Sequence, residues 1–249
     1  MQRLDELPVR GHFRMRGMAA TRIETFTDAA FAFALTLLVL TADIPANYGE
    51  LIATLRGVPA FLLSATLLMM FWYGHHTWSR RFGLDDGPTI LLSSLLVATV
   101  LIYVYPLRFL FTAMMDWFTY LLGVPLNPDL PALEVHQVNR LFIVYGAGFV
   151  AMCATIVLLN LHAWRLREQL RLNSVERHET QAEIRAWLIV GSAGLLSILI
   201  ALVTPNTRWG PAGWAYSLLA IVMPLYGRWA NRRREAILTG LSTAGGRRQ

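Results

Sequence analysis

The sequence of 249 residues has few charges, a single cysteine and no lysine. Charged residues make up 15% of the chain, against about a quarter in a typical soluble domain. The lone Cys153 excludes a disulfide within the chain, and no spaced cluster of cysteine and histidine suggests a zinc or haem site. The shortage of charge argues against a water-soluble protein, and no resident cofactor or metal is expected.

Long apolar runs take the place of the missing charges, and 55% of the residues are hydrophobic. Runs of about 20 apolar residues match the hydrocarbon thickness of a bilayer, whereas a soluble chain interrupts them with polar faces. The pattern predicts an all-α integral membrane protein in which residues 1–249 form a single transmembrane domain. Six spans are expected, at about residues 18–42, 58–78, 87–112, 141–164, 186–207 and 209–227.

All 22 basic residues are arginine, and their distribution predicts an orientation. With six spans, 18 of the 22 fall in the two termini and in the 2–3 and 4–5 connections, which share one side of the membrane. Arginine-rich connections stay in the cytoplasm, so both termini are expected there. Topology therefore accounts for the net charge of +6, and no nucleic-acid partner is expected.

The first span differs from the others because its uncharged run, residues 29–41, is too short to cross a bilayer alone. It must extend back through Asp28, Glu24 and Arg22. Ionisable groups inside a span are costly and face protein or water rather than lipid, so these residues are functional candidates. A packing network that fixes the orientation of the helix is the plainer alternative for Arg22 and Asp28.

Helical periodicity separates two faces of this first span. At about 100° per residue, one apolar stripe contains Phe26, Phe33, Leu37 and Leu40, and the two carboxylates point the opposite way. Around a symmetry axis, such a stripe would form stacked hydrophobic rings, which can gate a pore by dewetting. Spacing alone leaves ordinary packing or contact with lipid open as the alternative.

Two motifs resemble the transmembrane protein 175 family, the lysosomal potassium channels with six-helix prokaryotic homologues. The first is Arg22…Phe26-Thr27-Asp28, followed by an Ala/Phe-rich stretch and Thr36-Leu37-Leu38-Val39. Thr27 stands where the family usually has serine. The second is Trp72-Tyr73-Gly74-His75-His76, like the family's Trp-x-x-His-His. The resemblance covers all six spans, and its specific motifs lie in the first half of the chain.

The resemblance implies a homotetramer in the inner (plasma) membrane of a prokaryote, with helix one lining a central pore for potassium and other monovalent cations. Phe33, Leu37 and Leu40 would form the hydrophobic constriction, although the family usually has Ile or Leu at the position of Phe33. Thr36 offers a hydroxyl to a partly dehydrated cation. The Thr-Val-Gly-Tyr-Gly filter of other potassium channels is absent.

The motif residues are expected to form a packing network that holds helix one against its neighbours: Arg22, Phe26, Thr27, Asp28, Trp72 and His75. Trp72 and His75 are the expected partners of Arg22 and Asp28, and Ser94 would take the place of a family asparagine early in span three. Adjacent residues such as His75 and His76 point to different sides of a helix, which argues against a shared metal site.

The resemblance therefore implies a potassium-permeable leak channel, and no enzyme is expected. The alternative is a secondary transporter or a proton-conducting pathway. A proton pathway needs a chain of titratable groups through the membrane. Spans two to six offer only a few, scattered: His75, His76, Arg108 and His162. An enzyme would need a second catalytic group beside the two carboxylates of the first span, and none accompanies them.

Overall fold

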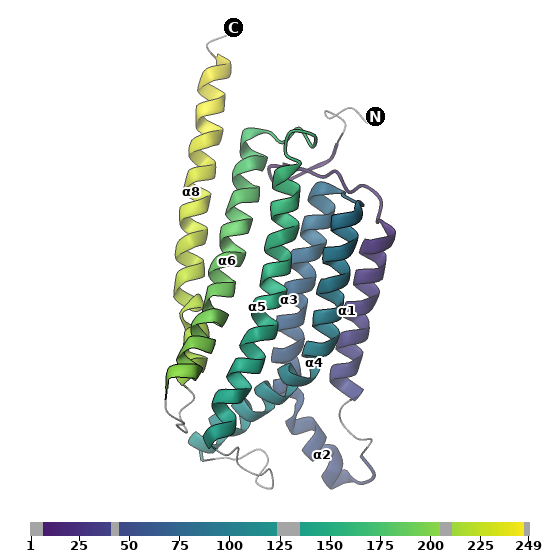
Figure 1. Ribbon diagram of the computed structural model, residues 1–249, viewed down its shortest axis with the longest axis vertical. Coiled ribbons are helices and arrows are strands. Elements are labelled where there is room, and N and C mark those ends of the chain that lie inside the picture. Colours follow the sequence, from purple (N-terminus) through teal and green to yellow (C-terminus); the bar gives the residue numbers. More distant parts are fainter. Residues whose placement is uncertain (1–6, 41–44, 124–134, 205–210, 247–249) are drawn as a thin grey trace.

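The computed structural model describes residues 7–40, 45–123, 135–204 and 211–246. These residues form an elongated helical bundle, preceded by a short hairpin of two strands (Figure 1). The elements are β1 (Val9–Arg10), β2 (Phe13–Arg14), α1 (Arg22–Leu40), α2 (Tyr48–Arg56), α3 (Val58–Phe82), α4 (Gly87–Leu121), α5 (Val135–Arg165), α6 (Ser174–Val203), the 3-10 turn η2 (Pro211–Gly213), α7 (Trp214–Ser217) and α8 (Leu219–Gly246).

Among the described residues, four helices are long and apolar enough to cross a membrane, namely α3, α4, α5 from Gln137 onward, and α6. The chain is therefore a multi-pass membrane protein. Beside these four lie α1, which begins with ionisable residues, and α8, whose apolar first part ends at Arg228 (Figure 1). The prediction of six spans is thus matched by four helices and otherwise stays a prediction.

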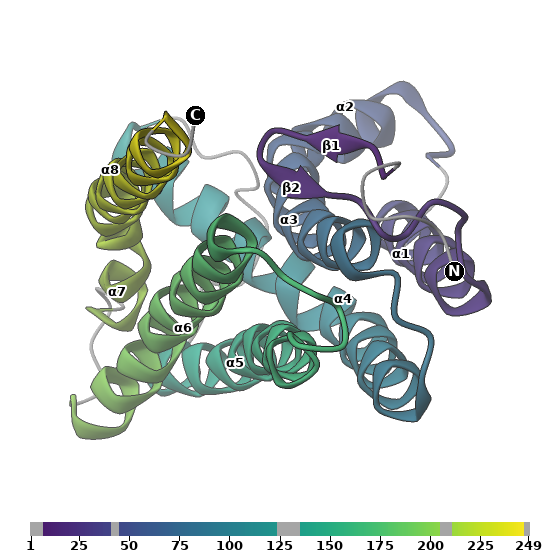
Figure 2. The same ribbon diagram turned by 90° about the horizontal axis from the view of Figure 1, so that it is seen from above.

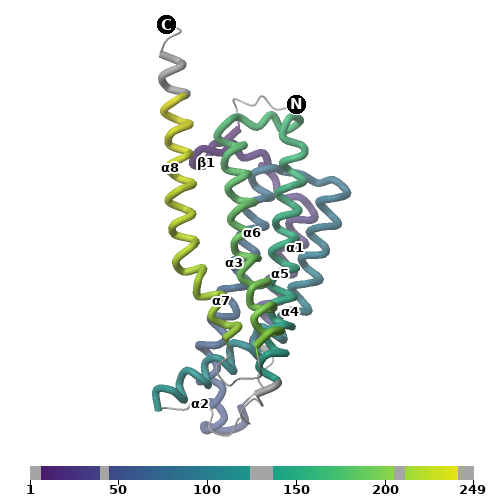
Figure 3. Tube along the Cα trace, turned by 60° about the vertical axis from the view of Figure 1, so that its left-hand side comes forward, coloured from purple at the N-terminus to yellow at the C-terminus, as the bar shows by residue number. Residues whose placement is uncertain are grey.

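Several helices extend beyond the predicted spans. The helix α4 continues to Leu121, α6 already begins at Ser174, and α8 runs on to Gly246 as a rod that projects from the bundle (Figure 3). Helix α6 begins early because Asn173 and Glu176 form a reciprocal capping box at its first turn. The segment predicted as the sixth span is broken among η2, α7 and α8 near Pro211 and Gly213. The sequence analysis predicted neither the short helix α2 nor the hairpin, and the hairpin adds two short strands to a chain expected to be all-α.

The arginine-rich segments share one end of the bundle. The β1–β2 hairpin, the end of α3, the α5–α6 turn and the C-terminal half of α8 lie together, and α2 lies at the opposite end (Figure 1). Seen from the arginine-rich end, α1 lies at one edge of the bundle and α8 lies at the other (Figure 2). The charge asymmetry found in the sequence is therefore an asymmetry between the two ends of the folded chain.

Glycines let α5 and α6 approach closely in the middle of the bundle. A Cβ atom added at Gly146 would lie 2.6 Å from the Ile198 side chain, and one added at Gly194 would lie 2.8 Å from Val150. Small residues serve this purpose in membranes, where helix association depends on close packing rather than on burial from water. The α5–α6 pair packs against α4, and α3 and α4 in turn contact α1.

The hairpin joins α1 to the end of α3. The backbone N–H of Gly17 donates to the carbonyl of Arg80 at 3.1 Å, and a Cβ at Gly17 would lie 2.6 Å from the carbonyl oxygen of Ser79. The Phe13 ring is buried edge-on against Phe82, with centroids 5.5 Å apart. The Gly17 contacts fix the chain five residues before α1 begins at Arg22, and so they set where the helix enters the bundle.

A second attachment ties the hairpin to the start of α6. The buried carboxylate of Glu176 accepts hydrogen bonds from the side chains of Arg14 and Arg16, at 2.8 Å and 2.9 Å. Burial alone would raise the pKa of Glu176. The hydrogen bonds from Arg14, Arg16 and the Asn173 backbone outweigh it and lower that pKa to about 2. The carboxylate is therefore ionised at neutral pH.

Candidate functional site

Helix α1 has one face packed inside the subunit and one face left uncovered by the described residues. Phe31, Ala34 and Leu38 are buried against α3 and α4. Phe26 and Phe33 are each 55% exposed, Thr36 is exposed, and Leu37 is half-buried. The side chain of Leu40 lies outside the described part of the chain. The uncovered arc is wider than the predicted stripe, because it also includes Val39.

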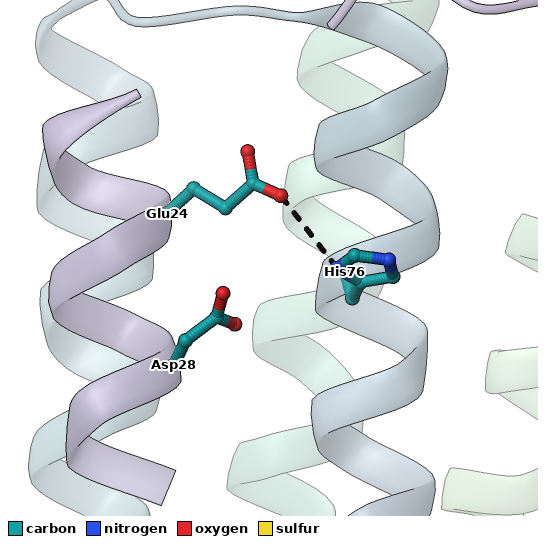
Figure 4. A group of neighbouring side chains, drawn as sticks. All are labelled: Glu24, Asp28 and His76. Atoms are coloured by element: carbon teal, nitrogen blue, oxygen red, sulfur yellow. Dashed lines mark ion pairs between the residues drawn. The ribbon is translucent and has the colours of Figure 1, made fainter. Parts of the chain in front are cut away.

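The two carboxylates of α1 point inward, toward α3 (Figure 4). The indole Nε1 of Trp72 donates a hydrogen bond to Oδ1 of Asp28 at 2.8 Å. One turn earlier on α1, Oε1 of Glu24 lies 3.6 Å from Nδ1 of His76 and 3.2 Å from Nε of Arg80. The face that carries charge is thus the face that the subunit covers, as the periodicity predicted.

Residue spacing explains how these groups meet. Trp72, His76 and Arg80 follow one another at intervals of four along α3, so they lie on one side of that helix. Glu24 and Asp28 have the same interval on α1. The rings of Trp72 and His76 stack with centroids 5.2 Å apart, which holds the indole in line with the carboxylate of Asp28. The two helices therefore meet along a ladder of polar contacts.

Glu24 makes the most demanding of these contacts. Its side chain is 1% exposed, and neither carboxylate oxygen accepts a hydrogen bond from the described residues. The positive charge of Arg80 compensates for this burial, because an isolated carboxylate would be too costly to remove from water. The pair fixes the rotation of α1 about its own axis at the end where the helix begins.

His75 occupies a different place from the one expected. Its Nε2 lies 3.0 Å from Oγ of Ser93 on α4, and both residues are buried. Two serines are adjacent in α4. Ser93 makes the contact with His75, whereas Ser94 is exposed. Ser93 rather than Ser94 therefore meets His75, because one position along a helix turns a side chain by about 100°.

Arg22 and Thr27 have simpler surroundings. Arg22 is the exposed first residue of α1 and forms no ion pair with any described residue, so it is not the partner of Asp28. Thr27 is buried, and its hydroxyl donates to the carbonyl of Ile23 at 2.8 Å. The helix starts where the Thr21 hydroxyl accepts a hydrogen bond from the N–H of Glu24 at 3.1 Å.

One group of side chains has the composition of a metal site. A carboxylate oxygen of Glu24, one of Asp28 and a ring nitrogen of His76 lie within 4.8 Å of one another (Figure 4). The set contains His76 but not the adjacent His75. Arg80 already neutralises Glu24, and Trp72 already binds Asp28. Both carboxylates thus already contact protein groups, and we assign no metal to these residues.

At the other end of α1, Arg108 of α4 donates a hydrogen bond to the backbone carbonyl of Leu38. The last carbonyls of a helix have no partner within it, and a cation there interacts favourably with the helix dipole. Helix α1 has no basic residue in its own last turn, so α4 supplies one. Arg108 thus holds the segment that contains Leu37 and precedes Leu40.

Sequence reasoning did not identify His76, Arg80 or Arg108 as part of this arrangement, and it left Glu24 without a partner. The four-residue spacing of Trp72, His76 and Arg80 was a usable signal, because it matches the spacing of the two carboxylates. No comparable signal marked Arg108, since its acceptor is a backbone carbonyl that any residue could supply.

Comparisons with known proteins identify relatives of this chain. The family model for the endosomal/lysosomal potassium channel TMEM175 matches residues 22–115, which contain α1, α3 and most of α4. A protein of Marivirga tractuosa named "Potassium channel" is 36% identical over 236 residues, covering 91% of this chain and 94% of that protein.

Two solved structures are also similar. The crystal structure of a threonine-to-alanine variant of the potassium channel MtTMEM175, in complex with a nanobody–MBP fusion, has a TM-score of 0.78 and 33% identity, covering 91% of this chain and all of that one. A lysosomal potassium-selective channel TMEM175 homologue from Chamaesiphon minutus shares the fold, with a TM-score of 0.54, 20% identity, and coverage of 84% of this chain and 97% of that one. The chain therefore belongs to the TMEM175 family of potassium channels.

Proposed function

We propose that this protein is a potassium-permeable leak channel, built as a homotetramer in which α1 of each subunit lines a central pore. The chain is similar to proteins named potassium channels over nearly their whole length. The observation that carries the proposal is the division of α1 into two faces. Every carboxylate of the helix is held against α3, and the opposite arc is left uncovered by the described residues of the subunit.

Symmetry converts this uncovered arc into a pore. A closed ring of four subunits brings the same face of each subunit to one axis. Helix α1 lies at an edge of the bundle, where such an axis can pass beside it without displacing another helix (Figure 2). The charged residues would then stabilise the wall of the pore and would not contact the ions.

We assign the narrow part of the pore to Leu37 and Leu40, with Phe33 as a further ring on the same stripe. Four apolar side chains around an axis exclude water, and an ion loses hydration there unless other ligands replace it. Thr36 offers such a ligand. Its hydroxyl donates to the carbonyl of Ala32 at 3.0 Å, so the lone pairs of the exposed oxygen are available to a cation.

We place the arginine-rich end of the bundle in the cytoplasm of a prokaryotic cell, with both termini on that side of the inner membrane. No feature of the described residues favours the transporter or proton-pathway alternative. His75 is bonded to Ser93, and the nearest other titratable groups belong to the ladder between α1 and α3. Potassium and other monovalent cations are thus the permeant species that we propose.

Reversal potentials test this function. Purified protein in planar bilayers, with potassium chloride on one side and sodium chloride on the other, should give a current that reverses toward the potassium equilibrium potential. A reversal potential near that of chloride, or no current from protein that is demonstrably folded, would contradict the proposal. Mass measurement in detergent at micromolar protein should give a tetramer, and monomer alone would exclude the four-fold pore.

A further inference from the structure

A polar cavity of about 270 Å³ lies at the arginine-rich end of the bundle, away from α1. It is an open cavity lined by the turn of the β1–β2 hairpin, the end of α3, the first turns of α6 and the middle of α8. Three arginines line it, Arg10, Arg81 and Arg234, together with His12 and His178. Two glutamates, Glu179 and Glu183, also line it. Even with neutral histidines, the lining carries an excess of positive charge.

The arginines of this cavity are incompletely paired. Arg81 lies 3.7 Å from Glu179 and 3.4 Å from Glu183, and Arg234 lies 3.8 Å from Glu179. By contrast, the pairs of Glu176 with Arg14 and Arg16, on the same hairpin, are 2.8 Å and 2.9 Å long. The Nε atom of Arg234 is buried without a hydrogen-bond acceptor among the described residues, and Arg10 forms no ion pair with them. Donors are therefore left over around the cavity.

The surroundings match the headgroup layer of a membrane. Close to the cavity, the Trp229 ring of α8 is covered by Arg233 at 4.8 Å and Arg185 at 5.8 Å. Tryptophan and arginine gather at the boundary between lipid and water, and basic pockets between membrane helices bind anionic headgroups there. A guanidinium presents its donors in a planar fork that fits the oxygens of a phosphate.

We propose that this cavity binds a phosphate ester, supplied by the headgroup of an anionic phospholipid of the cytoplasmic leaflet. Its oxygens would take donors from Arg10 and Arg234, and Arg81 would share its charge between the ligand and the glutamates. The inference depends on the membrane placement proposed above, and it does not depend on which ion the channel conducts. A bound headgroup would join the hairpin, which leads into α1, to α6 and α8.

Lipid retention measured by native mass spectrometry tests this site. The protein, purified in detergent with phosphatidylcholine, is titrated with phosphatidylglycerol, and the bound fraction is compared between variants. Arg10→Gln/Arg234→Gln should weaken phosphatidylglycerol binding about tenfold or more, because each lost charge-assisted hydrogen bond is worth about a factor of ten. The matched control Arg165→Gln/Arg232→Gln removes the same charge from exposed positions at the same end and should bind as the unmodified protein does.

Three results of this experiment would contradict the proposal. Equal weakening in both double variants would mean that net charge alone attracts the lipid, and this would overturn the site. Retention of phosphatidylcholine as strong as that of phosphatidylglycerol would overturn the anionic selectivity. Glycerol 3-phosphate that competes at micromolar concentration would overturn the lipid as the source of the phosphate. None of these readouts uses ion flux, so a failure here is distinct from a failure of the channel proposal.

Discussion

Trp72 of α3 holds Asp28 of α1 through a hydrogen bond of 2.8 Å from its indole Nε1 to the carboxylate oxygen Oδ1. The bond turns the most conspicuous charge of the motif away from the uncovered face of α1. Arg22, six residues earlier in the same motif, takes no part in it. Within the motif, Asp28 therefore contacts α3, and Arg22 does not.

Substitutions at Asp28 should change stability more than ion preference. Asp28→Ala leaves the indole N–H of Trp72 without an acceptor, and we expect a loss of about 1–3 kcal/mol in unfolding free energy. Asp28→Asn keeps a carbonyl oxygen at the same place and should cost less. Thermal unfolding in detergent checks the order of the variants, and potassium/sodium reversal potentials check that selectivity is unchanged. A stable Asp28→Asn variant with sharply altered selectivity would show that the carboxylate faces the ions.

Glu24 should be the more costly carboxylate to neutralise. Glu24→Gln leaves the charge of Arg80 uncompensated at the buried helix contact, and we expect about 3 kcal/mol of destabilisation. Glu168→Gln is a suitable control, since that residue is 70% exposed in its ion pair with Arg177 and such surface pairs contribute about 0–1 kcal/mol. Equal unfolding temperatures for the two variants would contradict the role given to Glu24.

The attachment of the hairpin through Glu176 should depend on pH. The pKa of this carboxyl is lowered from 4.5 in the unfolded chain to about 2 in the folded one. Its contribution, on the order of 3 kcal/mol, is therefore present above about pH 4.5 and is lost as the pH falls toward 2. The difference in unfolding free energy between the protein and Glu176→Gln should shrink from pH 7 to pH 3. A difference that stays constant with pH would show that the ion pairs with Arg14 and Arg16 are not its source.

Arg108 should stabilise the last turn of α1. Arg108→Met removes the donor to the Leu38 carbonyl, and we expect faster amide hydrogen exchange in residues 37–40 and a loss of about 1 kcal/mol. The exposed Arg140 on α5 serves as control, because Arg140→Met removes a charge at the same end of the bundle. If exchange in this turn is unchanged, α1 is held there by its apolar contacts alone.

Periodicity predicted the two faces of α1 in part, because a helix converts residue number into angle. Phe26 and Phe33 on one side, and Glu24 and Asp28 on the other, follow from that rule. The predicted stripe was too narrow, since Val39 is also 55% exposed, and Leu37 is half-buried. The partner of Glu24 could not be found the same way, since Arg80 is brought to it only when α1 packs against α3. Likewise, only the folded α3–α4 contact distinguishes Ser93 from Ser94, because the two are equally plausible in the sequence.

The ends of the chain were harder to predict than its middle. The hairpin consists of two-residue strands that no pattern of alternating residues could reveal. Its position depends on Glu176, more than 150 residues away in the sequence. The segment predicted as a single last span is divided near Pro211 and Gly213, although it carries no charged residue. Hydropathy therefore identified the apolar segments. Long-range contacts and backbone breaks determined where the helices begin and end and where the hairpin lies.

The central claim is that the uncovered face of α1 lines the ion pathway, and neighbouring leucines test it. Leu37 lies at the edge of that face, whereas Leu38 is 0% exposed in the subunit core. Leu37→Ala should widen the constriction, admit water, raise single-channel conductance and lower the potassium preference. Leu38→Ala should cost about 2–5 kcal/mol of stability and leave both properties alone, and Leu38→Val offers a milder form of the same control.

The decisive measurement is the single-channel conductance and the potassium/sodium permeability ratio of Leu37→Ala beside the Leu38 variants, in the same planar bilayers. The account predicts higher conductance and a lower ratio for Leu37→Ala alone. Equal changes at both positions, or a change confined to Leu38, would contradict the assignment of the pore to this face of α1.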